Sequence, residues 1–510
     1  MRAIPPPTQD GTKTHPMSST TMAAPAAAAA AATSDAADYW ARQAIEALRR
    51  DFAAPSGQEQ GGPTLSSRAM AVALLAMHDA YFTVAGGDPA RLPGLPAKPA
   101  SVGPAQAELA MGAAASRALR ALYAKQTALI PPAGSHENPP ASDLDAQAHG
   151  EAVAEAWIAA RAGDLALVNG PSPHPASPLP GRHRVDPFDP GQGFQGSIWG
   201  GLPRFLVPPQ PLAPPPGLGD PHYAADFGEV ARQGWDRYGR HATAQEREDE
   251  ETGIYWAYDG AVGIGTPPRL YLQVVLQVLA DFEAALGAAS VTTARRLRAL
   301  AMVSAAVADA CADAWHHKYA YDVWRPVLGV NEPLGLMPPA LGAGTPGWKP
   351  VGAPRTNQPG RLHVPPNFPA YPSGHATFGA AAFMTLRHCA ERFGWASAPG
   401  DGEADAIGFS FTSDELDGRN VDPRTGVARA AAPRTYASLW EAIVENAESR
   451  IFLGVHWRFD GVSVALPGGG SGPGSPARPA ELGDVGGVRL GVEVAARVRE
   501  LWLDALAPGA

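Results

Sequence analysis

Cysteine is scarce in this chain of 510 residues, which contains only Cys311 and Cys389. Two cysteines are too few for a disulfide framework or for a zinc site built from cysteine ligands. Both residues lie in apolar, helix-like stretches, where a free thiol behaves as a small buried hydrophobe. We therefore expect two buried free cysteines and assign no chemistry to them.

Long apolar runs and a positive net charge are also lacking. No run of about 18 uncharged apolar residues occurs, so we predict no membrane span. The formal net charge is −10, whereas a protein that binds nucleic acid normally carries a basic face. The sequence therefore argues against a membrane-spanning protein and against nucleic acid as a partner.

The first 35 residues are rich in Pro, Thr, Ser and Ala. The alanine run at 23–32 is only weakly hydrophobic and has no basic flank beside it, so it does not look like a signal peptide. We predict a disordered leader over 1–35. We expect a soluble protein that is either cytoplasmic or exported by a non-standard route.

Strand signals are scarce, because no sustained alternation of β-branched and polar residues occurs. Apolar residues instead recur every three to four positions, which is typical of helices. The ranges with this spacing are 36–52, 65–84, 105–129, 142–163, 222–240, 243–258, 268–287, 291–322, 373–394, 435–456 and 487–505. The sequence therefore predicts an all-α fold with long Pro/Gly-rich connecting loops.

Proline and glycine cluster between the helical ranges and divide the chain. We predict an N-terminal helical bundle over 36–168, a Pro/Gly-rich linker over 169–221 and a C-terminal helical bundle over 222–505. The chemically distinctive motifs fall in the C-terminal bundle, so we place the active site there.

The first of three such motifs runs from Lys318 to Pro326. Lys318 and Arg325 are seven residues apart, so on one helix they would return to nearly the same face. Pro326 would end that helix. Two cations on one face can hold a single anion from two sides.

The second motif is Pro372-Ser373-Gly374-His375, which precedes an apolar helix. Ser373 is a natural N-cap, and Gly374 lets an anion approach the backbone N–H closely. The free N–H groups and the dipole of a helix N-terminus favour anions. His375 would lie in the first turn, where it can face a bound anion.

The third motif contains Arg450, His456 and Asp460. Arg450 and His456 would lie near the end of a helix, about 120° apart, so Arg450 must reach across with its long side chain. Asp460 follows His456 by one turn, where its carboxylate could fix the imidazole tautomer and raise its basicity. Together the three motifs supply the cations, hydroxyl, glycine N–H and imidazoles that match phosphate or vanadate.

Several stretches resemble one known superfamily, which is shared by vanadium-dependent haloperoxidases and type 2 phosphatidic acid phosphatases. The specific likeness is to the chloroperoxidase type of haloperoxidase, and it covers about 255–461. The stretches that carry it are Phe368–Gly379, Ser449–Asp460, Phe411–Leu416, Trp256–Gly260 and Gly265–Arg269.

The resemblance implies vanadate as the cofactor, with His456 as the direct ligand of vanadium. It implies that the vanadate oxygens are held by Lys318, Arg325, Ser373, the Gly374 N–H and Arg450. His375 would be the acid–base residue, and the implied catalytic set is His375, Lys318, Arg325, Ser373 and Arg450. Asp259 and Asp460 would support these groups from behind, and Trp315 and Phe368 would flank the halide.

The resemblance also implies the reaction and its partners. Hydrogen peroxide would oxidise chloride and/or bromide to hypohalous acid, which would halogenate an organic acceptor. Bromoperoxidases of this family often have histidine at the position of Phe368, which hints at chloride. Whether the protein forms a homodimer through the N-terminal bundle stays an open question.

Two other functions remain to be weighed. In a soluble acid phosphatase with the same pocket, His456 would form a phosphohistidine and His375 would protonate the leaving group. A binding module for oxyanions would need the pocket but not His375. Trp315, Phe368 and the extended chloroperoxidase-like stretches favour the haloperoxidase.

Overall fold

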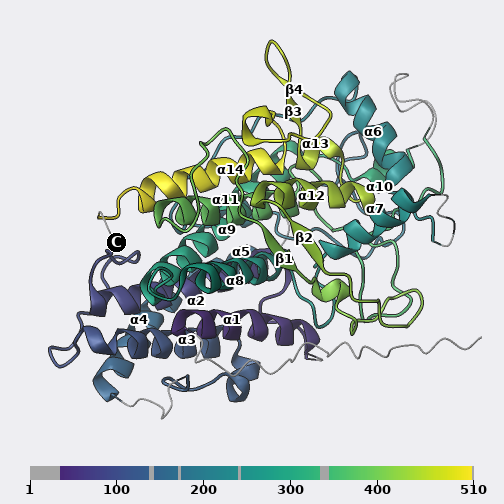
Figure 1. The fold of residues 1–510 in the computed structure, drawn as a ribbon. Helices are drawn as coiled ribbons and strands as arrows, with labels where there is room; N and C mark the ends of the chain where they lie inside the picture. The colour runs from purple at the N-terminus through teal and green to yellow at the C-terminus, as the bar shows by residue number, and fades with distance from the viewer. Residues whose placement is uncertain are drawn as a thin grey trace, which may run out of the picture. The chain divides into compact units, whose positions relative to one another are not determined.

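Helices form the architecture of the protein, which we describe from a computed structural model (Figure 1). The structure describes residues 35–54, 56–136, 143–169, 174–238, 240, 243–332 and 344–507, so the predicted leader lies outside it apart from Asp35. The α-helices are α1 (Ala36–Ala53), α2 (Gly62–Ala85), α3 (Ala107–Leu122), α4 (Leu144–Ala160), α5 (Ala166–Asn169), α6 (Pro221–Gln233), α7 (Ala244–Tyr255), α8 (Pro267–Leu286), α9 (Thr293–Tyr321), α10 (Pro326–Gly329), α11 (Gly374–Arg392), α12 (Leu439–Phe452), α13 (Arg458–Gly461) and α14 (Gly487–Val498). The all-α prediction is confirmed.

Short helical turns and strands complete the fold. The 3₁₀ turns are η1 (Pro104–Gln106), η2 (Ala124–Leu129), η3 (Ala162–Leu165), η4 (Trp199–Gly201), η6 (Asp414–Leu416) and η7 (Pro479–Glu481), and a π-helical turn, η8, spans Arg499–Leu503. Strands β1 (Phe409–Phe411) and β2 (Arg434–Tyr436) pair antiparallel, with Phe409 opposite Tyr436. Strands β3 (Val464–Ala465) and β4 (Ser471–Gly472) form a second antiparallel pair. Segments of two or three residues are too short to show an alternating pattern, so the sequence did not predict them.

The helix starts follow from local sequence chemistry. The side chains of Asp35, Thr292, Ser373 and Ser438 accept hydrogen bonds from backbone N–H groups in the first turns of α1, α9, α11 and α12. Such caps satisfy N–H groups that have no partner within the helix. The α11 cap matters most for function, because it fixes where the Ser373–His375 segment begins.

The centre of the fold is the pair α9 and α11, and α11 packs on both α9 and α14 (Figure 1). A Cβ atom on Gly491 of α14 would lie 2.4 Å from the Thr377 carbonyl oxygen of α11, so glycine permits this close approach. Because α9 and α11 are held by neighbours on several sides, the residues at their ends have fixed positions.

One motif prediction and one predicted helix end differ from the structure. α9 stops at Tyr321, where Asp322 takes a left-handed conformation with φ 57°. Pro326 therefore begins α10 instead of ending the preceding helix, and the prediction of Lys318 and Arg325 on one helix is wrong. Proline fits a first helical position because its missing N–H would have no partner there.

The predicted helix over 435–456 likewise ends at Phe452. Gly454 follows with φ 67°, a conformation that glycine adopts without a steric penalty. His456 therefore lies in the turn between α12 and α13, not near the end of a helix as predicted. This turn lets His456 approach Arg325 from another part of the chain.

Residues from Asp35 onward belong to one compact unit, in which α2 packs along α9. The division into bundles over 36–168 and 222–505 with a linker over 169–221 stays a prediction. Among the described helices, none has the length and apolar character needed to cross a bilayer.

Candidate active site

The three sequence motifs meet at the ends of four helices. Lys318 comes from the last turn of α9, Arg325 from the start of α10, and His375 from the first turn of α11. Arg450 lies in the last turn of α12, and His456 follows that helix. We call the group Lys318, Arg325, Gly374, Arg450 and His456 the anion site.

The imidazole of His456 is held by groups on both ring nitrogens. Its Nδ1 lies 3.0 Å from Asp460 Oδ2, and its Nε2 lies 3.0 Å from Arg325 Nη1. A guanidinium group can only donate hydrogen bonds, so Nε2 must accept and Nδ1 must carry the proton. His456 therefore presents an unprotonated Nε2, the form that can bind a metal centre.

Electrostatics favour the same form of His456. Burial, together with the charges of Arg325 and Lys318, lowers the pKa of His456 well below its ordinary value. Burial raises the pKa of Asp460 to about 8, while the charge of Lys318 acts in the opposite direction. Asp460 also accepts from the Trp457 N–H at 2.9 Å, so the carboxyl group that positions the ring is itself fixed.

Arg450 and Arg325 bring buried N–H groups that have no partner among the described residues. Arg450 Nη2 donates to both carboxylate oxygens of Asp259, at 2.9 and 3.0 Å, but its Nε and Nη1 are unpaired. Arg325 donates to the carbonyls of Phe368 and Val455, which leaves its Nη2 unpaired. An unsatisfied buried donor costs about 1–3 kcal/mol, and more when it is charged. A bound oxyanion would satisfy all three nitrogens, so these residues fit a vanadate or phosphate group.

Lys318 uses its ammonium group differently. Its Nζ donates to the carbonyls of Pro369, Ala370 and Pro372. Burial, followed by the charge of Arg325, lowers its pKa well below the usual value, yet three carbonyl acceptors match the three donors of an ammonium group. Lys318 thus fixes the segment that leads into Ser373 and adds positive charge. Its direct hold on an anion stays a prediction.

The first turn of α11 provides neutral groups. The Ser373 hydroxyl caps the helix through the Ala376 N–H, and Gly374 occupies the first helical position and lines a cavity. A backbone N–H at such a position has no partner within its helix. It is available to an anion, as the motif predicts.

His375 lines the same cavity, and its Nε2 is hydrogen bonded to the Ala257 carbonyl. Because a carbonyl only accepts, Nε2 carries the proton and Nδ1 is unprotonated. Burial, with the charge of Arg450, lowers the pKa of His375 to about 3, while Asp259 at 3.9 Å opposes the shift. A negative charge bound nearby would raise this pKa again.

The two aromatic residues predicted for the halide region are in contact. The ring centroids of Trp315 and Phe368 are 4.8 Å apart, and both rings line the cavity. Lys318 Nζ and Arg325 Cζ lie 5.1 and 4.9 Å from the Phe368 centroid. An apolar wall therefore borders two of the cations.

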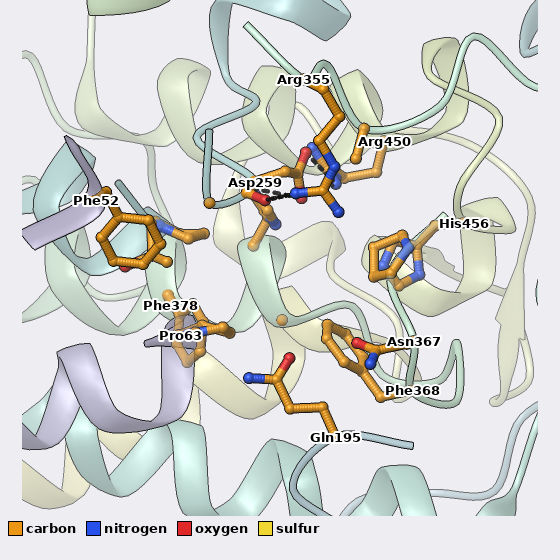
Figure 2. A pocket seen from close by; sticks show the side chains of 18 of the residues that line it. Phe52, Pro63, Gln195, Asp259, Arg355, Asn367, Phe368, Phe378, Arg450 and His456 are labelled. Carbon is orange, nitrogen blue, oxygen red and sulfur yellow. Dashed lines mark hydrogen bonds and ion pairs between the residues drawn. The ribbon is translucent and has the colours of Figure 1, made fainter. Parts of the chain in front are cut away.

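The cavity above the anion site has a volume of about 310 Å³ and includes residues that sequence analysis missed. Phe52 and Pro63 come from the N-terminal part, and Gln195 comes from the predicted linker. Arg355 and Asn367 come from the loop between α10 and α11 (Figure 2). No local pattern marks these residues, because only the tertiary fold brings them to the cavity. The one available signal was the length of the loop itself.

Comparisons with known proteins agree with this architecture. The family description "VCPO second helical-bundle domain" matches residues 298–469. The vanadium chloroperoxidase of Curvularia inaequalis is 33% identical over 476 residues, which cover 79% of this chain and 75% of that protein. Two bacterial structures share the fold at lower identity. A vanadium-dependent iodoperoxidase has a TM-score of 0.58 and 18% identity, covering 91% of this chain and 95% of its own. An apo-type vanadium-dependent chloroperoxidase has a TM-score of 0.56 and 13% identity, covering 86% and 94%.

The fold and the cation-rich pocket define an all-α protein with a candidate oxyanion site. The extent of the likeness to the Curvularia protein then decides the family. The chain belongs to the vanadium-dependent haloperoxidases, in their chloroperoxidase branch. Its general function is that of a haloperoxidase.

Proposed function

We propose that this enzyme uses vanadate to oxidise chloride or bromide with hydrogen peroxide, and that the resulting hypohalous acid halogenates an organic acceptor. The observation that carries the proposal is a set of three buried guanidinium nitrogens of Arg325 and Arg450 near an unprotonated His456 Nε2. These nitrogens have no partner in the part of the chain that the structure describes. Family membership supports the general haloperoxidase activity.

In this proposal His456 Nε2 would bind vanadium, and the N–H groups of Arg325, Arg450 and Gly374 would hold the oxygens. The Ser373 hydroxyl would add a further hydrogen bond. When bound, vanadate supplies Lewis-acid activation of hydrogen peroxide toward a halide without changing its own oxidation state. The surrounding cations are fixed before the reaction, so they stabilise developing negative charge without reorganising.

His375 is the residue that would move protons. Its Nε2 is committed to the Ala257 carbonyl, so Nδ1 is the nitrogen that would take up and release a proton. The charge of the bound anion would bring the pKa of His375 back toward neutrality, where a general acid–base group works best. Asp259 would support this role by orienting Arg450 and by its own charge near the ring.

Trp315 and Phe368 are the proposed halide-flanking residues. Their rings exclude water from one side of the site, which strips a halide of part of its hydration shell. Lys318 and Arg325 provide the compensating positive charge behind Phe368. We propose that chloride is accepted as well as bromide.

A phosphomonoesterase is the second candidate function, because the same unpaired donors would hold phosphate. His456 Nε2 would then be the nucleophile and His375 would protonate the leaving group. The observation that favours it is the unprotonated Nε2, which both chemistries need.

The test is peroxide-dependent halogenation of a simple diketone by protein stripped of oxyanions and then supplied with vanadate or with phosphate. We expect halogenation with vanadate only, with measurable rates for both chloride and bromide. Absence of halogenation, together with phosphate-ester hydrolysis that vanadate blocks, would overturn the proposal in favour of the phosphatase.

A further inference from the structure

The cavity is larger than the proposed inorganic reactants require. Its volume of about 310 Å³ lies at the lower end of the ~300–1,000 Å³ that small-molecule sites occupy. A tetrahedral oxyanion, a peroxide and a halide together fill only part of such a volume, since one water occupies about 30 Å³ in the liquid. The part of the cavity away from the anion site, which we call the outer cavity, has room for an organic molecule.

The walls of the outer cavity differ in character (Figure 2). Phe52, Pro63 and Phe378 line one side, and Phe378 stacks on Trp315 with the ring planes 13° apart. Such surfaces pack well against a flat ring. The N-terminal part of the chain thus contributes an apolar wall to a cavity whose floor comes from the C-terminal part.

Arg355 lies across from this wall, beside Asp259 and Arg450 (Figure 2). Its Nη1 donates to the Asp259 carbonyl at 3.1 Å, which fixes the guanidinium close to the catalytic region. Its Nε is buried and has no partner among the described residues. Neither of the two acids nearest the site is spare, because the Asp259 carboxylate pairs with Arg450 and that of Asp460 with His456.

From this geometry, and resting on the proposed function, we propose that the outer cavity binds a planar organic acceptor carrying an ionised oxygen. The acceptor class is a phenolate or an enolate, with its oxygen on Arg355 and its ring against Phe52 and Phe378. Arg355 is then a specificity-determining residue that selects which acceptor is halogenated within the enzyme.

The bound acceptor would be halogenated by hypohalous acid formed at the floor of the same cavity. The ring or enolate carbon gives an electron pair to the halogen, so a carbon–halogen bond forms and the halogen–oxygen bond breaks. The electrons of that bond remain on the departing hydroxide. A ring carbon then loses its proton, so the phenol and hypohalous acid become the halophenol and water. No further oxidant is needed.

The test measures binding of 4-nitrophenolate, compared with its neutral methyl ether, 4-nitroanisole, in the presence of saturating phosphate to fill the anion site. Arg355→Met keeps the apolar stem and removes the charge, and Arg355→Gln is a second neutral variant. Arg361→Met is the matched control, because Arg361 also lines the cavity but has an exposed side chain.

We expect both Arg355 variants to bind 4-nitrophenolate about 10-fold or more weakly, since a hydrogen bond to a charged group is lost. Binding of 4-nitroanisole should change less than twofold, and Arg361→Met should retain most of the phenolate affinity. Equal losses for both ligands, or unchanged phenolate binding in both Arg355 variants, would overturn the proposal.

Product analysis separates this proposal from the proposed function. Phenol halogenated by the vanadate-loaded enzyme should show an ortho-to-para ratio different from that of free hypobromous acid, and Arg355→Met should restore the free ratio. A wild-type ratio equal to that of the free acid would overturn halogenation in place while leaving the haloperoxidase proposal standing. Arg355-dependent phenolate binding without any vanadate-dependent halogenation would support the acceptor site and overturn the haloperoxidase proposal.

Discussion

Two of the groups of buried charge among the described residues differ in how completely they are paired. The N-terminal charge cluster consists of His78, Asp79, Asp88 and Arg298. The His78 ring nitrogens lie 2.9 Å from Asp79 Oδ1 and 3.1 Å from Asp88 Oδ2, and Arg298 Nε lies 3.2 Å from Asp88 Oδ2. Burial would raise the pKa of Asp88, but the hydrogen bond and charge of His78, the charge of Arg91 and the Trp502 hydrogen bond together lower the pKa to about 2.

The anion site has the opposite arrangement. Three nitrogens of Arg325 and Arg450 are buried without partners among the described residues. In the N-terminal charge cluster each polar side-chain atom of His78, Asp79 and Asp88 has a partner, including the indole N–H groups of other helices. Paired buried charges hold helices together, whereas unpaired ones cost folding free energy unless a ligand satisfies them. The three nitrogens of Arg325 and Arg450 are therefore open to a ligand, whereas His78, Asp79 and Asp88 serve helix packing.

The largest expected effect comes from removing the proposed ligand of vanadium. His456→Ala should abolish vanadate-dependent halogenation and weaken vanadate binding by more than the ~10–100-fold typical of losing an outer-shell partner. Equilibrium dialysis with vanadate measures the affinity. Asp460→Asn removes only an outer partner of His456, so its vanadate affinity should fall by an amount within that ~10–100-fold range. Tight vanadate binding by His456→Ala would remove this residue as the ligand.

Removing the proposed acid–base group should separate binding from turnover. His375→Ala should keep vanadate affinity within about 10-fold but lower kcat by ~10²–10⁴, the usual contribution of general acid–base catalysis. Steady-state halogenation at saturating vanadate provides the comparison. If chlorination by this variant proceeds at the wild-type rate, proton transfer must be assigned to another group.

Disrupting the N-terminal charge cluster should lower the stability of the protein and leave its catalytic rate unchanged. Asp88→Asn leaves Arg298 without its carboxylate partner and removes one of the two carboxylates that contact His78. We therefore expect a loss of ~3–5 kcal/mol in the free energy of unfolding. Urea denaturation measures this, and kcat per folded molecule should stay the same. Asp401→Asn, which disrupts a surface ion pair with Arg499 at 2.9 Å, should change stability by less than ~1 kcal/mol. A large fall in kcat for Asp88→Asn would mean that the two clusters are coupled.

The two clusters also differ in how far sequence could predict them. The motifs placed Lys318, Ser373 and His456 in one site, because each segment carries its own chemistry. The helix end at Phe452 was missed, since apolar spacing continues past the turn residues that stop the helix. The N-terminal charge cluster and the contact between Arg355 and Asp259 join distant segments through tertiary packing, which no local spacing encodes.

A smaller effect should appear in the pH dependence of stability. The pKa of His375 is about 3 in the folded protein and about 6.5 in an unfolded chain, so the unfolded state binds the extra proton. Stability of the oxyanion-free protein should therefore fall as pH decreases from about 6.5 toward 3. Between pH 7 and 5 this one group contributes a loss of ~2 kcal/mol.

The variant His375→Gln isolates this contribution from that of other histidines. Urea denaturation at pH 7 and 5 should show that the variant loses ~2 kcal/mol less than the wild type. His316→Gln, at an exposed position of α9, is the control and should follow the wild type. Identical pH dependence in His375→Gln and wild type would mean that His375 is not held neutral in the folded protein.

The smallest expected effect concerns the choice of halide. The Phe368 ring lines the cavity and lies over both Lys318 and Arg325, so Phe368→His would add a polar ring and water beside both cations. Chloride is harder to oxidise than bromide and holds its hydration shell more firmly, so it should lose more rate. We expect the bromide-to-chloride ratio of kcat/KM to rise about 10-fold, or ~1.4 kcal/mol. Phe378→His alters the same cavity at a ring whose centroid lies 6.2 Å from that of Trp315, and it should leave the ratio unchanged. If both variants shift the ratio equally, general cavity polarity, and not the ring beside Lys318 and Arg325, sets the preference.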